Sequence, residues 1–92
     1  MDIVWSSDAK ADFLEGLVWL AERNQGAADR FERDVDLIVQ HLARHPFMGR
    51  QTKIDGLRVM SLVKWQRRIA YQPMPDRIYI VSMKHTRQNT TT

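Results

Sequence analysis

The chain contains no cysteine. Disulfide bonds, thiolate nucleophiles and cysteine-ligated zinc are therefore excluded, and we expect a reducing, cytoplasmic location. No apolar run approaches the roughly 20 residues that a membrane-spanning helix needs, and no N-terminal signal segment is recognisable, so we expect no membrane partner. A length of 92 residues predicts one domain, 1–92, with a single hydrophobic core.

Acidic residues are scarce in the second half of the chain. Residues 1–46 carry five basic and nine acidic residues, whereas residues 47–92 carry nine basic and two acidic ones. The formal net charge of +3 therefore combines a basic half of +7 with an acidic half of −4. Such asymmetry predicts that the second half meets an acidic or polyanionic partner.

The first half has the pattern of one strand and two helices. The β-branched and aromatic segment 2–5 predicts a strand, and Ser6 or Ser7 can cap a helix that extends to about residue 24. Apolar residues then recur at steps of three and four over 28–42, which predicts a second amphipathic helix ending before Pro46. A short connection makes these helices an antiparallel hairpin.

The second half predicts an antiparallel meander of three strands that follows a loop over 46–56. The expected strands and the turns between them, in chain order, are 57–63, 64–66, 67–72, 73–76 and 77–83. We expect the polar ending 88–92 to be disordered. The resulting order, β-α-α-β-β-β, is an α+β architecture with the helical hairpin on one face of a small sheet.

Alternation along these strands divides the side chains between two faces. Ile69 and Tyr71 share one face of their strand, and Arg68 lies opposite. We expect one face of the sheet to pack against the helices and the other to collect Arg58, Arg68 and the basic ending. Guanidinium groups keep their charge at any working pH and bind carboxylates and phosphates bidentately, so this face is suited to an anionic partner.

Five segments together resemble the RelE/ParE superfamily of bacterial toxins, with the ParE-like branch favoured, and the resemblance covers nearly the whole chain. The segments are VWSSDAKADF, HPFMGR, DGLR, RRIAY and IYIVSMKHTR. The resemblance implies the toxin of a type II toxin–antitoxin pair, neutralised by a cognate acidic antitoxin. ParE-like toxins bind DNA gyrase and trap it on cleaved DNA, whereas RelE-like toxins cut mRNA in the ribosome.

The choice between these activities depends on whether a catalytic set is present. RNA cleavage needs a base, an acid and phosphate stabilisers, and the residues available for a RelE-like ribonuclease are Arg58, Arg68, His85 and Arg87. Arg58 follows DG at the position of a phosphate-stabilising arginine in RelE-like enzymes, but an antitoxin ion pair or a solvated charge explains it as well. No tyrosine follows the last strand, so we favour gyrase binding. Plain nucleic-acid binding ranks third because both helices are in the acidic half.

The residues expected to contact the target or the antitoxin are the cations and the tryptophan of the meander. They are Arg58, Lys64, Trp65, Arg67, Arg68, Lys84 and Arg87. Trp65 is expected either to be an exposed anchor among basic residues or to fold onto the sheet edge, whereas Trp19 is expected in the core. His41 and His45 lack a third ligand, so we expect no metal, and no cofactor is expected. An apolar strip awaiting the antitoxin predicts self-association or a toxin–antitoxin heteromer.

Overall fold

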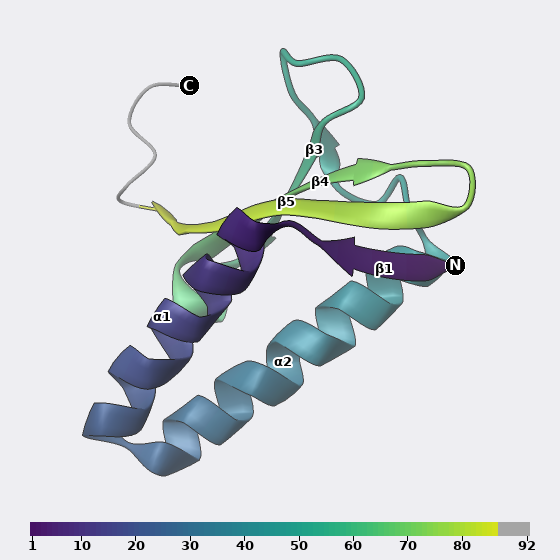
Figure 1. Ribbon diagram of the computed structural model, residues 1–92. Coiled ribbons are helices and arrows are strands. Elements are labelled where there is room, and N and C mark those ends of the chain that lie inside the picture. The colour runs from purple at the N-terminus through teal and green to yellow at the C-terminus, as the bar shows by residue number, and fades with distance from the viewer. Residues whose placement is uncertain (87–92) are drawn as a thin grey trace.

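A computed structural model describes residues 1–86 and has the predicted α+β architecture (Figure 1). Arg87 and the polar ending 88–92 lie outside the described residues. In chain order the elements are β1 (Asp2–Trp5), α1 (Ser7–Arg23), α2 (Gln25–Arg44), β2 (Arg50–Gln51), β3 (Arg58–Leu62), the 3₁₀-helix η1 (Val63–Trp65), β4 (Arg67–Pro73) and β5 (Arg77–His85).

The sheet has five strands in the order β1-β5-β4-β3-β2. Strands β3, β4 and β5 form the predicted antiparallel meander, and β1 lies parallel to β5 at one edge. The loop prediction for 46–56 was partly wrong, because Arg50 and Gln51 pair antiparallel with β3 as the short edge strand β2. Two residues are too few to show an alternating pattern, so this strand could not be predicted from the sequence.

Ser6 joins the sheet to the first helix. Its hydroxyl oxygen accepts a hydrogen bond from the Ala9 amide at 2.9 Å, which confirms the predicted N-cap. The same hydroxyl donates to the Val81 carbonyl at 2.7 Å, and the Ser6 amide donates to the Ile80 carbonyl at 2.9 Å. The start of α1 is therefore fixed against the middle of β5.

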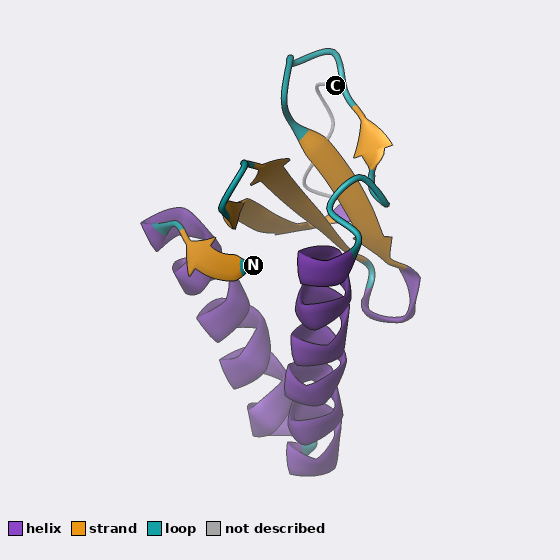
Figure 2. Ribbon diagram, turned by 90° about the vertical axis from the view of Figure 1, so that its right-hand side faces the viewer, coloured by secondary structure: helices purple, strands orange, loops and turns teal. Residues whose placement is uncertain are grey.

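One residue, Asn24, connects the two helices. Its amide donates to the Leu20 carbonyl at 2.7 Å at the end of α1, and its side chain accepts from the Ala27 amide at 3.1 Å at the start of α2. The helices therefore turn back on each other at once and lie together on one side of the sheet (Figure 2). No helix among residues 1–86 is long and apolar enough to span a lipid bilayer.

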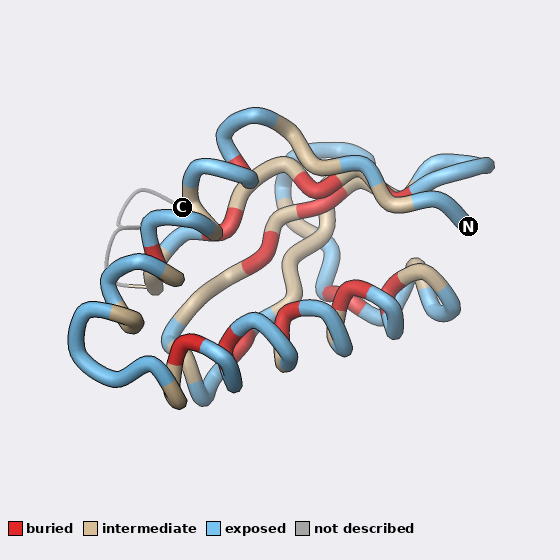
Figure 3. The backbone as a smooth tube through the Cα atoms, turned by 60° about the horizontal axis from the view of Figure 1, so that its bottom comes forward, coloured by how far each residue is buried: buried red, intermediate tan, exposed pale blue. Residues whose placement is uncertain are grey.

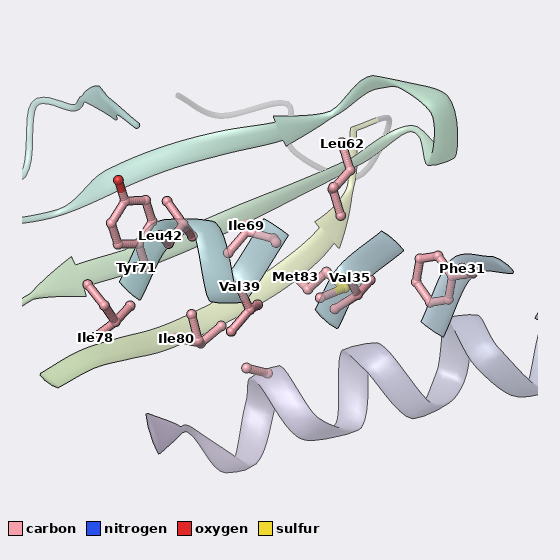
Figure 4. Packing of buried hydrophobic residues seen from close by; sticks show 11 residues of the cluster. Phe31, Val35, Val39, Leu42, Leu62, Ile69, Tyr71, Ile78, Ile80 and Met83 are labelled. Carbon is pink, nitrogen blue, oxygen red and sulfur yellow. The ribbon is translucent and has the colours of Figure 1, made fainter. Parts of the chain in front are cut away.

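The core lies between the helical hairpin and one face of the sheet. The predicted stripe of α2 turns its buried residues toward the strands (Figure 3). Figure 4 shows the packed side chains of this core. The largest fully buried side chains are Tyr71, Phe31, Leu42, Ile69, Ile78, Ile80, Met83 and Val35. Trp19 does not join them: its side chain is 51% exposed, so the core prediction for this residue was wrong.

Candidate interaction surface

The HPFMGR segment is held by the hydroxyl of Tyr71. This buried hydroxyl donates to the Pro46 carbonyl at 2.9 Å and accepts from the Gly49 amide at 2.8 Å. Burial is the main cause that raises the pKa of Tyr71, so the phenol stays protonated and keeps its donor. A Cβ atom on Gly49 would lie 2.5 Å from that hydroxyl oxygen, which explains why the loop has glycine here.

Arg58 completes this arrangement from the next strand. Its Nη1 atom donates to the carbonyls of Gly49 at 2.7 Å and Phe47 at 3.0 Å, and its guanidinium lies 5.0 Å from the Phe47 ring centre. We call these residues the loop clasp: Pro46, Phe47, Gly49, Arg58 and Tyr71. Three of the five segments that carry the family resemblance, HPFMGR, DGLR and RRIAY, therefore meet in space, and their contacts fix the loop.

The prediction that Arg58 and Arg68 share one face was wrong. Directly paired residues of an antiparallel ladder lie on the same face, and Arg58 pairs with the buried Tyr71. Arg68 alternates with the buried Ile69 and so points to the opposite, open face. Leu62 is buried on the same side as Arg58, which shows that the even-numbered residues of β3 face the helices.

The open face of the sheet carries a basic groove of about 770 Å³. Cross-strand pairing places Arg68 beside Lys84, and Val59 beside both Arg50 and Ala70. The connection after β2, which projects at the top of Figure 1, forms the other wall. The lining residues of the basic groove are Arg50, Gln51, Thr52, Lys53, Ile54, Leu57, Val59, Arg68, Ala70, Ser82 and Lys84.

The cations of the basic groove differ in what they bind. Lys84 donates to Asp12 Oδ1 at 2.9 Å, and this hydrogen bond is the main cause that raises its pKa. Within residues 1–86, no carboxylate lies within ion-pairing distance of Arg50, Lys53 or Arg68. The Nε atom of Arg68 is buried and has no hydrogen-bond partner there. An unmade hydrogen bond of this kind costs about 1–3 kcal/mol, so an anionic ligand that reaches it would gain affinity.

The other predicted contact residues lie on the helix side of the sheet. Arg67 pairs with His85 across β4 and β5, and both are near η1 and the end of α1. Lys64 lies 3.6 Å from Asp34 Oδ2. Of the two alternatives for Trp65, the exposed anchor was wrong, because its half-buried indole donates to Asp34 Oδ2 at 2.8 Å. Arg87 lies outside the described residues.

Sequence reasoning missed Arg50 and Lys53. Both lie in the segment assigned to a loop, and only the pairing of β2 with β3 brings them to the open face.

The histidine pair considered as a possible metal site is His41 and His45, and the centres of their rings are 4.9 Å apart. Residues 1–86 contain no group of three or more potential metal ligands.

A helical hairpin on one face of a short, mostly antiparallel sheet defines the class of small RelE/ParE-like toxin folds. Residues 3–90 match the family described as ParE toxin of type II toxin-antitoxin system, parDE. The chain belongs to this family, which confirms the resemblance predicted from the sequence.

Two solved structures share the fold. A structure titled as the chromosomal ParDE system from P. aeruginosa superposes with a TM-score of 0.67 at 18% identity, covering 92% of this chain and 95% of that one. A YoeB/ParE toxin from Agrobacterium tumefaciens gives 0.63 at 20% identity, covering 92% and 98%. A comparison with curated proteins gave no match.

Proposed function

We propose that this toxin acts in the cytoplasm by binding DNA gyrase, without catalysing a reaction itself, and that a cognate antitoxin neutralises it. The chain's membership of the type II toxin family implies an antitoxin partner. The basic groove is the surface that we assign to the target, because its unpaired cations complement an acidic protein surface or the phosphates of gyrase-bound DNA.

The observation that carries this proposal is the separation of the candidate catalytic residues. A ribonuclease must bring its base, acid and phosphate stabilisers within hydrogen-bonding reach of one phosphate. Arg58 binds loop carbonyls on the helix side, Arg68 faces the open side, and His85 lies beside Arg67 at the far end of β4. These three residues therefore do not converge on one phosphate. Binding to gyrase does not need such convergence, because the basic groove alone can provide the contact surface.

DNA supercoiling by purified gyrase provides the test. The wild-type toxin should inhibit supercoiling, and Arg68→Met should weaken inhibition by about tenfold or more, as expected when a charged hydrogen bond is lost. Arg77→Met is the matched control, because Arg77 is exposed, paired with Asp76 at 2.9 Å and absent from the groove lining. Equal potency of Arg68→Met and Arg77→Met would reject the groove as the gyrase contact.

One observation favours the alternative, a ribosome-dependent mRNA endoribonuclease. Arg68 and Lys84 lie directly opposite each other on the open face, so that a phosphate that displaces Asp12 from Lys84 would contact both cations. The Agrobacterium tumefaciens protein that shares the fold is described as a YoeB/ParE toxin. Codon-dependent mRNA cleavage on ribosomes, together with unaffected gyrase, would establish this alternative. His85→Ala then separates the mechanisms, because an enzyme should lose orders of magnitude in rate whereas a binder should lose little.

A further inference from the structure

A second cavity lies on the helix side of the sheet, where α1, α2 and η1 meet the end of β5. Its volume is about 510 Å³, within the usual range of binding pockets. We call it the end pocket, and its lining residues are Glu15, Trp19, Leu20, Phe31, Lys64, Trp65, Gln66, Arg67 and His85. It shares no lining residue with the basic groove.

The guanidinium of Arg67 is built into this pocket. A Cβ atom on Gly16 would lie 3.0 Å from Arg67 Nη2 and 3.2 Å from its Cζ, so the buried glycine of α1 makes room for the group. The ring of Phe31 lies below it, 5.9 Å from Cζ to the ring centre. Within the described part of the chain no carboxylate lies within ion-pairing distance of Arg67, and Glu15, although it lines the pocket, forms no ion pair with it.

Aromatic side chains form the walls around this cation. The Trp65 indole is fixed by its 2.8 Å hydrogen bond to Asp34 and packs edge-on against Phe31, with 5.4 Å between ring centres. Trp19 is half exposed and stacks under the Arg23 guanidinium, which lies 3.8 Å above the ring centre. Tryptophan and arginine in a partly desolvated pocket are the residues that carry most binding energy in protein interfaces.

We propose that the end pocket binds an acidic side chain of the antitoxin, with a neighbouring apolar side chain of the same segment packed on Trp19 and Trp65. This inference rests on the proposed toxin–antitoxin function. Arg67 supplies the charge that a carboxylate complements, since Lys64 is already paired with Asp34, and the indole rings supply the apolar contact. The sequence neighbours Arg67 and Arg68 therefore belong to different binding surfaces on opposite faces of the sheet.

The test compares two adjacent arginines in one binding assay. The antitoxin encoded by the neighbouring reading frame is purified and titrated into wild-type toxin, Arg67→Met and Arg68→Met by calorimetry. Arg67→Met should weaken antitoxin binding by about tenfold to a hundredfold, because a charge-assisted hydrogen bond is lost. Arg68→Met should change the affinity by less than about threefold, as removal of a charge outside the contact does. Equal effects, or no effect of Arg67→Met, would overturn the proposal.

Gly16→Ala separates a binding role of Arg67 from a structural one. The new methyl group would lie 3.0 Å from Nη2 and forces the guanidinium to shift by a few tenths of an ångström, while alanine is a better helix former than glycine. We expect weaker antitoxin binding at an unchanged or higher Tm; unchanged affinity would count against the pocket. Binding of a single-stranded oligonucleotide that depends on Arg67 would replace the acidic peptide with a nucleic acid and also overturn the inference. Gyrase inhibition by the wild type, measured in parallel, tests the proposed function independently of these affinities.

Discussion

Two arginines on neighbouring strands illustrate two uses of the same side chain. Arg58 of the loop clasp donates to two backbone carbonyls at 2.7 and 3.0 Å, so its donors hold the chain together. Arg68 of the basic groove keeps a buried Nε atom without a partner in the described structure. Both arginines belong to segments that carry the family resemblance. Arg58 uses its hydrogen bonds to hold the fold, whereas Arg68 keeps a donor that a ligand can use.

The difference between the loop clasp and the basic groove follows from what surrounds each cation. Backbone carbonyls of Phe47 and Gly49 satisfy the hydrogen-bonding needs of Arg58 within the protein, and Tyr71 holds the same loop through the Pro46 carbonyl and the Gly49 amide. The groove offers Arg68 a cationic neighbour, Lys84, and an apolar floor formed by Val59 and Ala70. We therefore expect changes in the clasp to reduce stability and changes in the groove to reduce binding.

The largest stability effect should come from Gly49→Ala in the loop clasp. The added methyl group would lie 2.5 Å from the Tyr71 hydroxyl oxygen and 2.7 Å from its Cε1, so the loop and its hydrogen bonds must move. We expect a loss of about 2–4 kcal/mol in the free energy of unfolding, measured by urea denaturation. Gly26→Ala in α2 is the control and should change stability by less than about 1 kcal/mol. Similar losses for both variants would contradict a special role for Gly49.

Exchanging the two arginines for methionine tests the comparison directly. Arg58→Met should reduce the free energy of unfolding by about 1–3 kcal/mol, because the part-buried bond to the Gly49 carbonyl and the exposed bond to the Phe47 carbonyl are both lost. Arg68→Met should leave it unchanged or raise it, since the variant removes a buried donor that has no hydrogen-bond partner in the described structure. If Arg68→Met proved the more destabilising variant, the assignment of these residues to clasp and groove would be reversed.

A smaller effect is expected from Tyr71→Phe, which keeps the buried ring and removes only the hydroxyl. The Gly49 amide and the Pro46 carbonyl lose their partner, and we expect a loss of about 1–2 kcal/mol in the free energy of unfolding. Tyr79→Phe is a suitable control, because Tyr79 is only half-buried on the neighbouring strand. A neutral Tyr71→Phe variant would show that packing of the ring alone holds the loop.

The elements set by local pattern could be predicted from the sequence. The apolar stripe of α2 gave the buried residues Phe31, Val35 and Leu42, since a helical period of 3.6 residues fixes which side chains share a face. The Ser6 cap was predictable because its hydrogen bond spans three residues. The antiparallel meander followed from alternating segments separated by turns, and the fold class was correct.

The candidate site was harder to predict because it depends on contacts between distant residues. Whether the side chains of Arg58 and Arg68 lie on the same face of the sheet is decided by the register of β3 with β4. A shift of this register by one residue would move a side chain to the other face. The hydrogen bond that fixes Trp65 is donated by its indole to Asp34, 31 residues earlier in the chain. The apolar pattern of α1 is compatible with a buried or an exposed Trp19. Only the packing of the two helices in the structure shows that its ring lies outside the core.

The smallest expected effect on stability concerns the hydrogen bond between Trp65 and Asp34 on the helix side of the sheet. The hydrogen bond from Trp65 is the main cause that lowers the pKa of Asp34 below its ordinary value of 3.8. The ionised carboxylate therefore stabilises the folded state fully above pH 3.8, and this contribution is lost as the pH falls through the lower pKa of the folded protein. Urea unfolding of the wild type and Asp34→Asn, followed by tryptophan fluorescence from about pH 5 to about pH 2, should show a steeper acid loss in the wild type.

Asp36→Asn provides the control for this measurement, because Asp36 is exposed on the same helix and forms no ion pair within the described residues. The stability of the Asp36→Asn variant should follow the wild-type curve in acid. The stability of Asp34→Asn should fall less steeply, since the neutral amide of the new asparagine can accept the Trp65 hydrogen bond at every pH. Parallel curves for all three proteins would mean that the Asp34–Trp65 contact is too weak to depend on charge. The wall of the end pocket would then be held by the packing of Trp65 on Phe31 alone.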